Sequence, residues 1–174
     1  GEGCESCSYD KSQNKFKCYE CISRNYTEVT NLYECISNTD PTNTQLYGCL
    51  RARYNSTTQK YECYICKPEF IPILNDKNCR LPTYANLNSD CREAINIGTA
   101  TAPLYSCTSC KSPYFNTNVT DHRGVHDCYS STGELILCEK ATKNAAGYLN
   151  CTKCMGNFKY IFSETYNKMI CDEN

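Results

Sequence analysis

Four Cys-x-x-Cys pairs recur along the 174-residue chain and constrain its fold more than any other feature. Their first members lie 45, 44 and 44 residues apart. We call the members of each pair positions a and b, and the single cysteines that follow them positions c and d. The a/b pairs are Cys18/Cys21, Cys63/Cys66, Cys107/Cys110 and Cys151/Cys154. The c and d cysteines are Cys35/Cys49, Cys79/Cys91, Cys128/Cys138, Cys171 (c only) and, before the first pair, Cys4 (d only). A fixed period indicates a repeat array.

Residues other than cysteine keep the same register. Similar strings begin at d, namely "CLRA" at Cys49, "CREA" at Cys91 and "CEKA" at Cys138, and "CESC" fits them with Cys7 in the place of alanine. The period predicts a partial repeat over 1–17, repeats over 18–62, 63–106 and 107–150, and a partial repeat over 151–174. The chain thus opens on a d element and closes after a c element. This phase fits a slice of a longer array or separate chains that stack end to end.

The composition explains why so many cysteines are needed. Leu, Ile, Val and Phe together number 28, about 16% of the chain, which is too little to support an ordinary apolar core. The 17 cysteines therefore predict a fold held by disulfides in an oxidising compartment, so we expect a secreted or cell-surface protein. A net charge of −1 without long runs of one sign argues against nucleic-acid partners. The longest apolar stretch, "FIPIL" at Phe70, is too short for membrane insertion.

Two disulfide schemes compete. Pairing each d with the next a, and each b with its own c, uses sixteen cysteines and leaves only Cys7, which lies outside the repeat. Pairing a with c and b with d leaves Cys4, Cys7 and Cys154 without partners. Sequence alone does not prove a connectivity, but parity favours the first scheme. Its bonds would be Cys4–Cys18, Cys21–Cys35, Cys49–Cys63, Cys66–Cys79, Cys91–Cys107, Cys110–Cys128, Cys138–Cys151 and Cys154–Cys171.

Metal and catalytic interpretations are weaker. "CESC" and "CYEC" resemble two zinc knuckles, but the other three pairs have no second pair nearby. An oxidoreductase would place its Cys-x-x-Cys at a helix N-terminus after a strand, whereas these pairs lie in short Tyr- and Thr-rich runs. The two histidines, His122 and His126, could suggest a metal site, yet Gly124 separates them and no catalytic glutamate accompanies them. We therefore predict no catalytic residues, no metal site, no cofactor and no enzyme activity.

Covalent modification is the more specific signal. Four Asn-x-Ser/Thr sequons, at Asn25, Asn55, Asn118 and Asn150, predict N-glycans on surface loops. Cys7 is expected to be unpaired and available for an intermolecular bond, or to exchange partners near the N-terminus with Cys18 or Cys21. The d-to-a and b-to-c loops predict short hairpins. One or two helical turns are expected after d, in "SDCREAINIG" from Ser89 and in "CEKATKNAAG".

The pattern Y-x-C-x-x-C-x3-aromatic, followed by two single cysteines, resembles the furin-like or growth-factor-receptor cysteine-rich repeats, most of all those in surface proteins of ciliates and other protists. That family often reads Cys-x-x-Cys-x-x-Gly-aromatic. "CTKCMGNFKYIF" keeps Gly156 near that place, whereas Pro68 and Pro113 replace it in two other repeats and "CISRNY" has neither. The resemblance implies small disulfide-rich repeats that form an elongated rod of short β-hairpins and irregular loops with little helix, on a cell surface or in secreted material.

The function expected from these features is that of a structural extracellular glycoprotein, a subunit of a surface coat, ciliary appendage or filament that assembles by end-to-end stacking. Its partners would be copies of itself or other surface glycoproteins. The alternative is a receptor-type cysteine-rich ectodomain that binds a ligand through exposed aromatic side chains. A zinc-binding module is the third and least favoured hypothesis.

Overall fold

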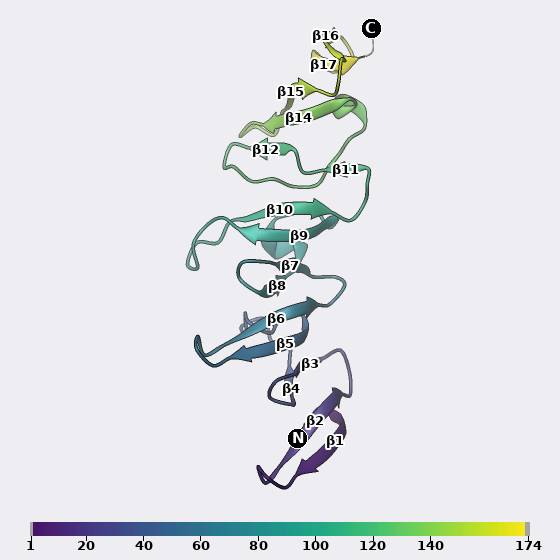
Figure 1. Cartoon of the computed structure of the whole chain (residues 1–174). Helices are drawn as coiled ribbons and strands as arrows, with labels where there is room; N and C mark the ends of the chain where they lie inside the picture. Colours follow the sequence, from purple (N-terminus) through teal and green to yellow (C-terminus); the bar gives the residue numbers. More distant parts are fainter. Residues whose placement is uncertain (1, 173–174) are drawn as a thin grey trace. The chain divides into compact units, whose positions relative to one another are not determined.

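The computed structural model describes residues 2–172 and divides the chain into two compact units, residues 1–84 and 85–174, which are described separately. The first unit contains β1 (Cys4–Asp10), β2 (Lys15–Cys21), β3 (Tyr26–Val29), β4 (Glu34–Ser37), β5 (Cys49–Asn55), β6 (Lys60–Cys66), β7 (Ile71–Ile73) and β8 (Asn78–Arg80) (Figure 1). A short helix, α1 (Pro82–Ala85), lies at the division. The second unit contains β9 (Cys91–Asn96), β10 (Tyr105–Cys110), β11 (Phe115–Asn116), β12 (Val119–Asp121), β13 (Tyr129–Ser130), η1 (Gly133–Leu135), β14 (Cys138–Lys143), β15 (Leu149–Cys154), β16 (Lys159–Ser163) and β17 (Lys168–Asp172).

Each repeat forms one antiparallel hairpin between d and b, and its register is the same all four times. The d cysteine faces the b cysteine, as Cys49 faces Cys66, and the residue three after d faces the a cysteine, as Ala52 faces Cys63. The four hairpins are β1–β2, β5–β6, β9–β10 and β14–β15. Irregular register after d recurs in each one, so the cysteine period corresponds to a structural period.

The eight disulfides are those of the d-to-a and b-to-c scheme predicted above, which is thereby confirmed. Each bond closes a local loop with a sequence separation of 13 to 18 residues. The covalently closed modules therefore run from a d cysteine to its c cysteine, and the expected repeat boundaries at position a fall inside a hairpin. Modules 1 and 2, Cys4–Cys35 and Cys49–Cys79, lie in the first unit. Modules 3 and 4, Cys91–Cys128 and Cys138–Cys171, lie in the second.

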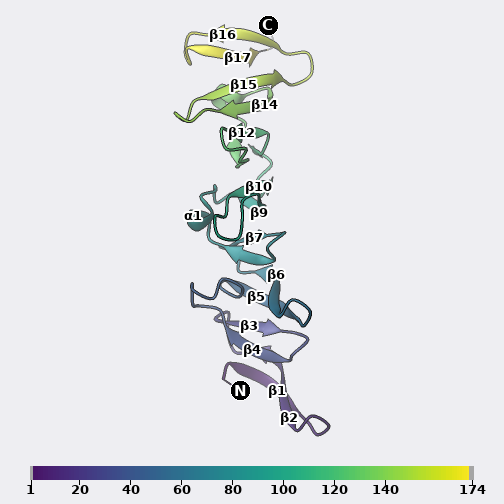
Figure 2. The ribbon, with the colours of Figure 1, turned by 90° about the vertical axis from the view of Figure 1, so that its left-hand side faces the viewer.

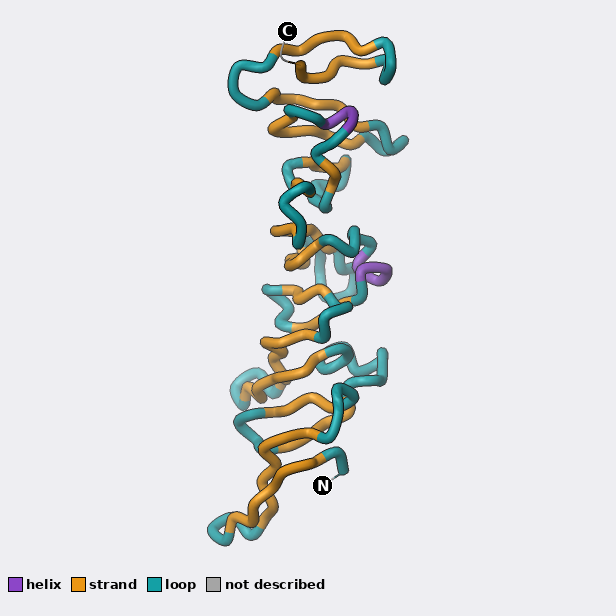
Figure 3. Tube along the Cα trace, turned by 90° about the vertical axis from the view of Figure 1, so that its right-hand side faces the viewer, coloured by secondary structure: helices purple, strands orange, loops and turns teal. Residues whose placement is uncertain are grey.

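The helices expected after d are wrong. Residues from Cys91 and from Cys138 form strands β9 and β14, each hydrogen-bonded to the strand that carries the next a cysteine. The cap and stop residues gave a local helical signal, but the d-to-a disulfide and the hairpin register override it. Figure 3 shows that helix is confined to α1 and η1, so the expectation of short hairpins with little helix is confirmed for the part of the chain described.

Backbone hydrogen bonds extend the d–b hairpin in every module and link it to the b-to-c segment in three of them. The amide after b donates to the carbonyl before d in all four modules, as Lys67 does to Gly48 (2.8 Å). The amide of the a cysteine donates to the carbonyl two residues before c in modules 1 to 3, as Cys63 does to Lys77 (2.8 Å). These bonds satisfy backbone groups at the hairpin edge that short strands would otherwise leave open.

In modules 1 and 2 the aromatic residue that follows b covers the glycine before d. Gly48 has a φ of +73°, and the ring of Phe70 lies so close that a Cβ on Gly48 would be 2.3 Å from ring carbons. Gly3 and Tyr26 repeat this contact in module 1, where the corresponding distance is 2.4 Å. Glycine suits both positions because it adopts a positive φ readily and leaves space beneath the ring.

Consecutive modules inside a unit join through a parallel strand pair. In the first unit β3 runs alongside β5, with Val29 opposite Ala52, and the amide of Thr30 donates to the carbonyl of Ala52 (3.1 Å). In the second unit β12 runs alongside β14 (Figure 2), with Val119 opposite Ala141. The two valines and the two alanines are all buried. Small alanine side chains thus let the strand of the preceding module approach β5 or β14 closely.

The apolar core is as thin as the composition predicts. One cluster in the first unit consists of Leu46, Cys49, Ala52, Phe70 and Cys79. A second cluster, in the second unit, contains Val119, Leu135, Cys138, Ala141, Cys154 and Cys171. Two of the five residues in the first cluster and three of the six in the second are disulfide-bonded cysteines. The disulfides therefore form much of the buried core.

Candidate functional site

The most regular constellation in the molecule is a group of sulfurs in each module. The Sγ atom of a lies 3.3 to 3.5 Å from the Sγ atom of c, although a and c belong to different disulfides. The Sγ atoms of d, a and c all lie within 4.8 Å of one another. The hairpin register creates this contact because a and b are only three residues apart and lead into two different bridges. The two disulfides of a module therefore touch.

Three clustered sulfurs have the spacing of a metal site, but their chemistry does not fit one. A cysteine binds a metal as its thiolate, and all twelve sulfurs in these groups are bonded to another sulfur. In the "CESC…CYEC" segment only Cys7 keeps its thiol. The pairing into disulfides thus argues against the zinc hypothesis.

The two histidines lie in different local environments. The Nδ1 atom of His126 lies 2.7 Å from the carbonyl oxygen of Thr117, and its main-chain amide and carbonyl bond to Ser106 and Cys107. His122 is exposed on the turn before it. Within residues 2–172 neither histidine belongs to a group of three potential metal ligands. His126 is a structural residue of module 3.

Cys7 lies on β1 at the position that alanine occupies in modules 2 to 4. Its side chain is exposed and unpaired, and its backbone lies opposite Cys18. Ala52, Ala94 and Ala141, its counterparts, are buried. The described part of the chain places no strand on the outer edge of β1.

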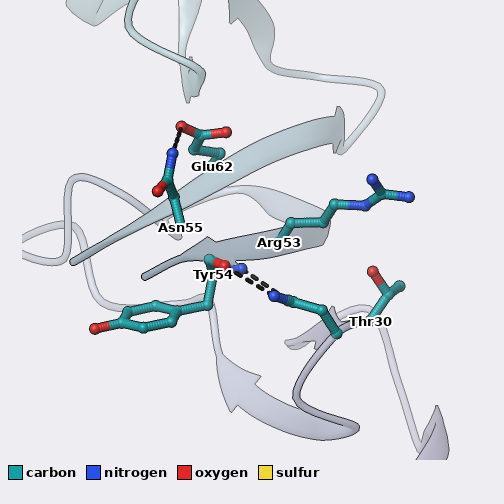
Figure 4. A pocket seen from close by; sticks show the side chains of 6 residues that line it. Thr30, Arg53, Tyr54, Asn55 and Glu62 are labelled. Carbon is teal, nitrogen blue, oxygen red and sulfur yellow. Dashed lines mark hydrogen bonds between the residues drawn. The ribbon is translucent and has the colours of Figure 1, made fainter. Parts of the chain in front are cut away.

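A hollow of about 460 Å³ lies on the first unit beside the turn of the β5–β6 hairpin (Figure 4). Its lining residues are Thr30, Asn31, Arg53, Tyr54, Asn55 and Glu62. The side chain of Asn31 holds the backbone of Tyr54 by two hydrogen bonds of 2.8 Å, as donor and as acceptor. This pairing extends the junction between modules 1 and 2 beyond the end of β3.

Two polar side chains of the hollow, Asn55 and Glu62, are bonded to each other. The Nδ2 atom of Asn55 donates to Glu62 (2.9 Å), and Lys77 pairs with the other carboxylate oxygen (3.1 Å). The hydrogen bond from Asn55, followed by that from Lys77, lowers the pKa of Glu62. Figure 4 shows the Arg53 guanidinium extending away from the Asn55–Glu62 pair. The hollow presents a polar surface without a nucleophile and base aimed at each other.

No protein-family model, no curated protein and no solved structure matches this chain.

Eight disulfides within two small β units indicate a cysteine-rich protein of an oxidising, extracellular compartment. Among the described residues, none of the helices has the length and apolar character needed to cross a lipid bilayer.

The predicted glycosylation sites occupy two kinds of position. Asn25, Asn118 and Asn150 are exposed, whereas Asn55 is half-buried at the rim of the hollow. The hydroxyl of Thr27, the third residue of the first sequon, is buried and donates to the carbonyl of Cys49 (2.7 Å). In the folded protein this hydroxyl of the Asn25 sequon is therefore inaccessible.

Sequence reasoning missed two structural roles. The alanine three residues after d was noted, but not its contact with a valine on the strand of the preceding module. Sequence reasoning also noted the aromatic after b without placing it over the residue before d. The signal for the second contact was present, since Gly3 and Gly48 both precede a d cysteine.

Proposed function

We propose that this protein is a structural extracellular glycoprotein, a subunit of a surface coat, ciliary appendage or filament in which modules join edge to edge. The observation that carries the proposal is the junction found in both units, a valine of one module against an alanine of the next. The same parallel pairing brings two modules together twice, with the same residue types buried. Such a junction can be repeated by any further module of the same build.

The outer edge of β1 supports joining between chains. It has the hairpin register of β5 and β14, and Cys7 is nearly as small as the alanine of those strands. In module 4, Ile161 on β16 follows the aromatic Phe158 by three residues, as Ile73 follows Phe70 and Val29 follows Tyr26. We propose that the β16–β17 hairpin of one copy docks on β1 of a second copy, with Ile161 opposite Cys7.

Sedimentation and electron microscopy of the glycosylated protein test this function. A Cys7→Ala variant, which restores the alanine of the other modules and removes disulfide dimers, should form end-to-end oligomers as its concentration rises. Cys7→Arg should remain monomeric, because the long charged side chain blocks the strand edge. Gln13→Arg, in the β1–β2 turn, adds the same charge away from the edge and should associate as Cys7→Ala does. Monodisperse Cys7→Ala particles at high concentration would contradict the proposal.

A receptor-type ectodomain is the second candidate, and exposed aromatic side chains favour it. Tyr9 and Phe16 form an edge-to-face pair with ring centroids 5.1 Å apart and remain 48% and 64% exposed. Such rings can stack on sugars or on an apolar peptide side chain. A glycan and peptide array would test it, with Tyr9→Ser/Phe16→Ser as the comparison. A ligand bound by the native protein and lost in this variant supports the receptor, and an array without such a ligand counts against it.

A further inference from the structure

Module 1 contains a fifth cysteine besides the four that form its two disulfides. Cys4, Cys18 and Cys35 place their Sγ atoms within 4.8 Å of one another, and Cys4 is bonded to Cys18. Cys7 lies directly opposite Cys18 in the β1–β2 hairpin. Side chains of directly opposed residues project from the same face of a hairpin, with Cα atoms about 4.5 to 5.5 Å apart. That spacing lies within the range of about 4.4 to 6.8 Å that a disulfide requires.

We propose that Cys7 is the resident nucleophile of an internal thiol–disulfide exchange in module 1. The Cys7 thiolate attacks the Sγ atom of Cys18, so a Cys7–Cys18 bond forms as the Cys4–Cys18 bond breaks. The electron pair of the broken bond leaves on the Sγ atom of Cys4, which takes up the proton that Cys7 released. One disulfide and one thiol exist before and after the step, and no external oxidant or reductant is consumed.

The structure confines this exchange to module 1. In modules 2 to 4 the residue opposite a is Ala52, Ala94 or Ala141, which carries no sulfur. The d, a and c cysteines of module 1 are each partly exposed, whereas in the other modules this group is mostly or wholly buried. Module 1 therefore has both a resident thiol and a bridge that the thiol can reach.

The exchange moves the free thiol along β1 without unfolding the hairpin. Cys7–Cys18 joins two residues already in register, whereas the bond it replaces is diagonal, because Cys4 lies opposite Cys21. The Cys21–Cys35 bridge is unaffected. The chain thus has two covalent isomers that offer a thiol at position 7 or at position 4.

Thiol mapping of the full chain tests the exchange. The protein is held in acid, where thiols are protonated, or incubated at mildly alkaline pH without added thiol, and is then alkylated and digested under non-reducing conditions. We expect the alkyl label on Cys7 in the acid sample and a growing fraction on Cys4 after alkaline incubation, together with a Cys7–Cys18 peptide. The rate should not depend on protein concentration, because the reaction is intramolecular.

Two variants make the test decisive. Cys4→Ser removes the competing sulfur, so Cys18 should be found bonded to Cys7 with no free thiol. Cys7→Ser should keep Cys4–Cys18 intact at every pH and show no label on Cys4. Label that stays on Cys7 after prolonged alkaline incubation, a rate proportional to protein concentration, or a Cys4→Ser protein with two free thiols would each overturn the proposal.

Discussion

The substitution Gly48→Ala tests the contact that connects the two hairpins of module 2. Two costs add in this variant. Alanine is forced into a φ of +73°, a left-handed conformation that costs a residue with a Cβ roughly 1–2 kcal/mol. The new Cβ also meets ring carbons of Phe70 at 2.3 Å, and overpacking of this kind typically costs about 1–3 kcal/mol. The expected loss of unfolding free energy is about 2–5 kcal/mol.

Phe70 has little room to yield. Its side chain is only 7% exposed, and its ring packs edge-on against Tyr47 with centroids 5.1 Å apart. Urea unfolding with the disulfides intact, followed by near-ultraviolet circular dichroism of the tyrosines, measures the loss. Gly124→Ala is the matched control, because Gly124 has a φ of +81° but no atom within 4 Å of its added Cβ. It should show the backbone cost alone, about 1–2 kcal/mol.

A double-mutant cycle separates the two costs in Gly48→Ala. Combining it with Phe70→Leu removes the ring and should recover part of the loss, so the coupling energy reports the ring contact directly. The reasoning is refuted if Gly48→Ala destabilises no more than Gly124→Ala, or if the cycle shows no coupling.

Four further outcomes are expected. Ala52→Leu should lower the unfolding free energy by about 1–3 kcal/mol and raise hydrogen exchange in β3, since it overfills the junction with Val29; unchanged exchange in β3 would contradict this. Complete reduction should abolish the β-sheet circular dichroism, because each closed loop contributes up to about 3 kcal/mol; a reduced protein that keeps it would disprove the role given to the bridges. The lowered pKa of Glu62 means that its stabilising effect is full above the unfolded-state pKa and is lost as pH falls through the folded-state pKa, so Glu62→Gln should flatten the acid limb of stability against pH. Secretion from eukaryotic cells should yield a mass that falls on glycosidase treatment, and Asn118→Gln should remove one glycan; an unchanged mass would exclude glycosylation.

The disulfide scheme could be predicted because it depends on counting. Sixteen cysteines fit one repeating pattern, and the remaining one, Cys7, falls outside the repeat. The hairpins followed from the same spacing, since a local bridge between d and a requires the chain to turn back on itself. Both are properties of the sequence period and need no knowledge of distant contacts.

The remaining features depend on contacts between residues that are distant in the sequence. "SDCREAINIG" contains a helix cap and stop, and only the pairing of β9 with β10 shows that its residues are extended. The role of Ala52 depends on Val29, twenty-three residues away in a different module. The contact between the a and c sulfurs could likewise not be predicted from the sequence, because a and c are bonded to other cysteines.

The local closure of every bridge has a mechanical consequence. Each disulfide spans residues of its own module, so a tensile load on the chain cannot draw out the loops that the bridges close. Between the first and the last bridge, the segments free to lengthen are those from c to d, such as the one between Cys35 and Cys49, and the two residues between a and b in each module. Under a stretching force the molecule should extend in small, separate steps and shorten again when the force is released. The disulfides of each module limit how far that module can extend.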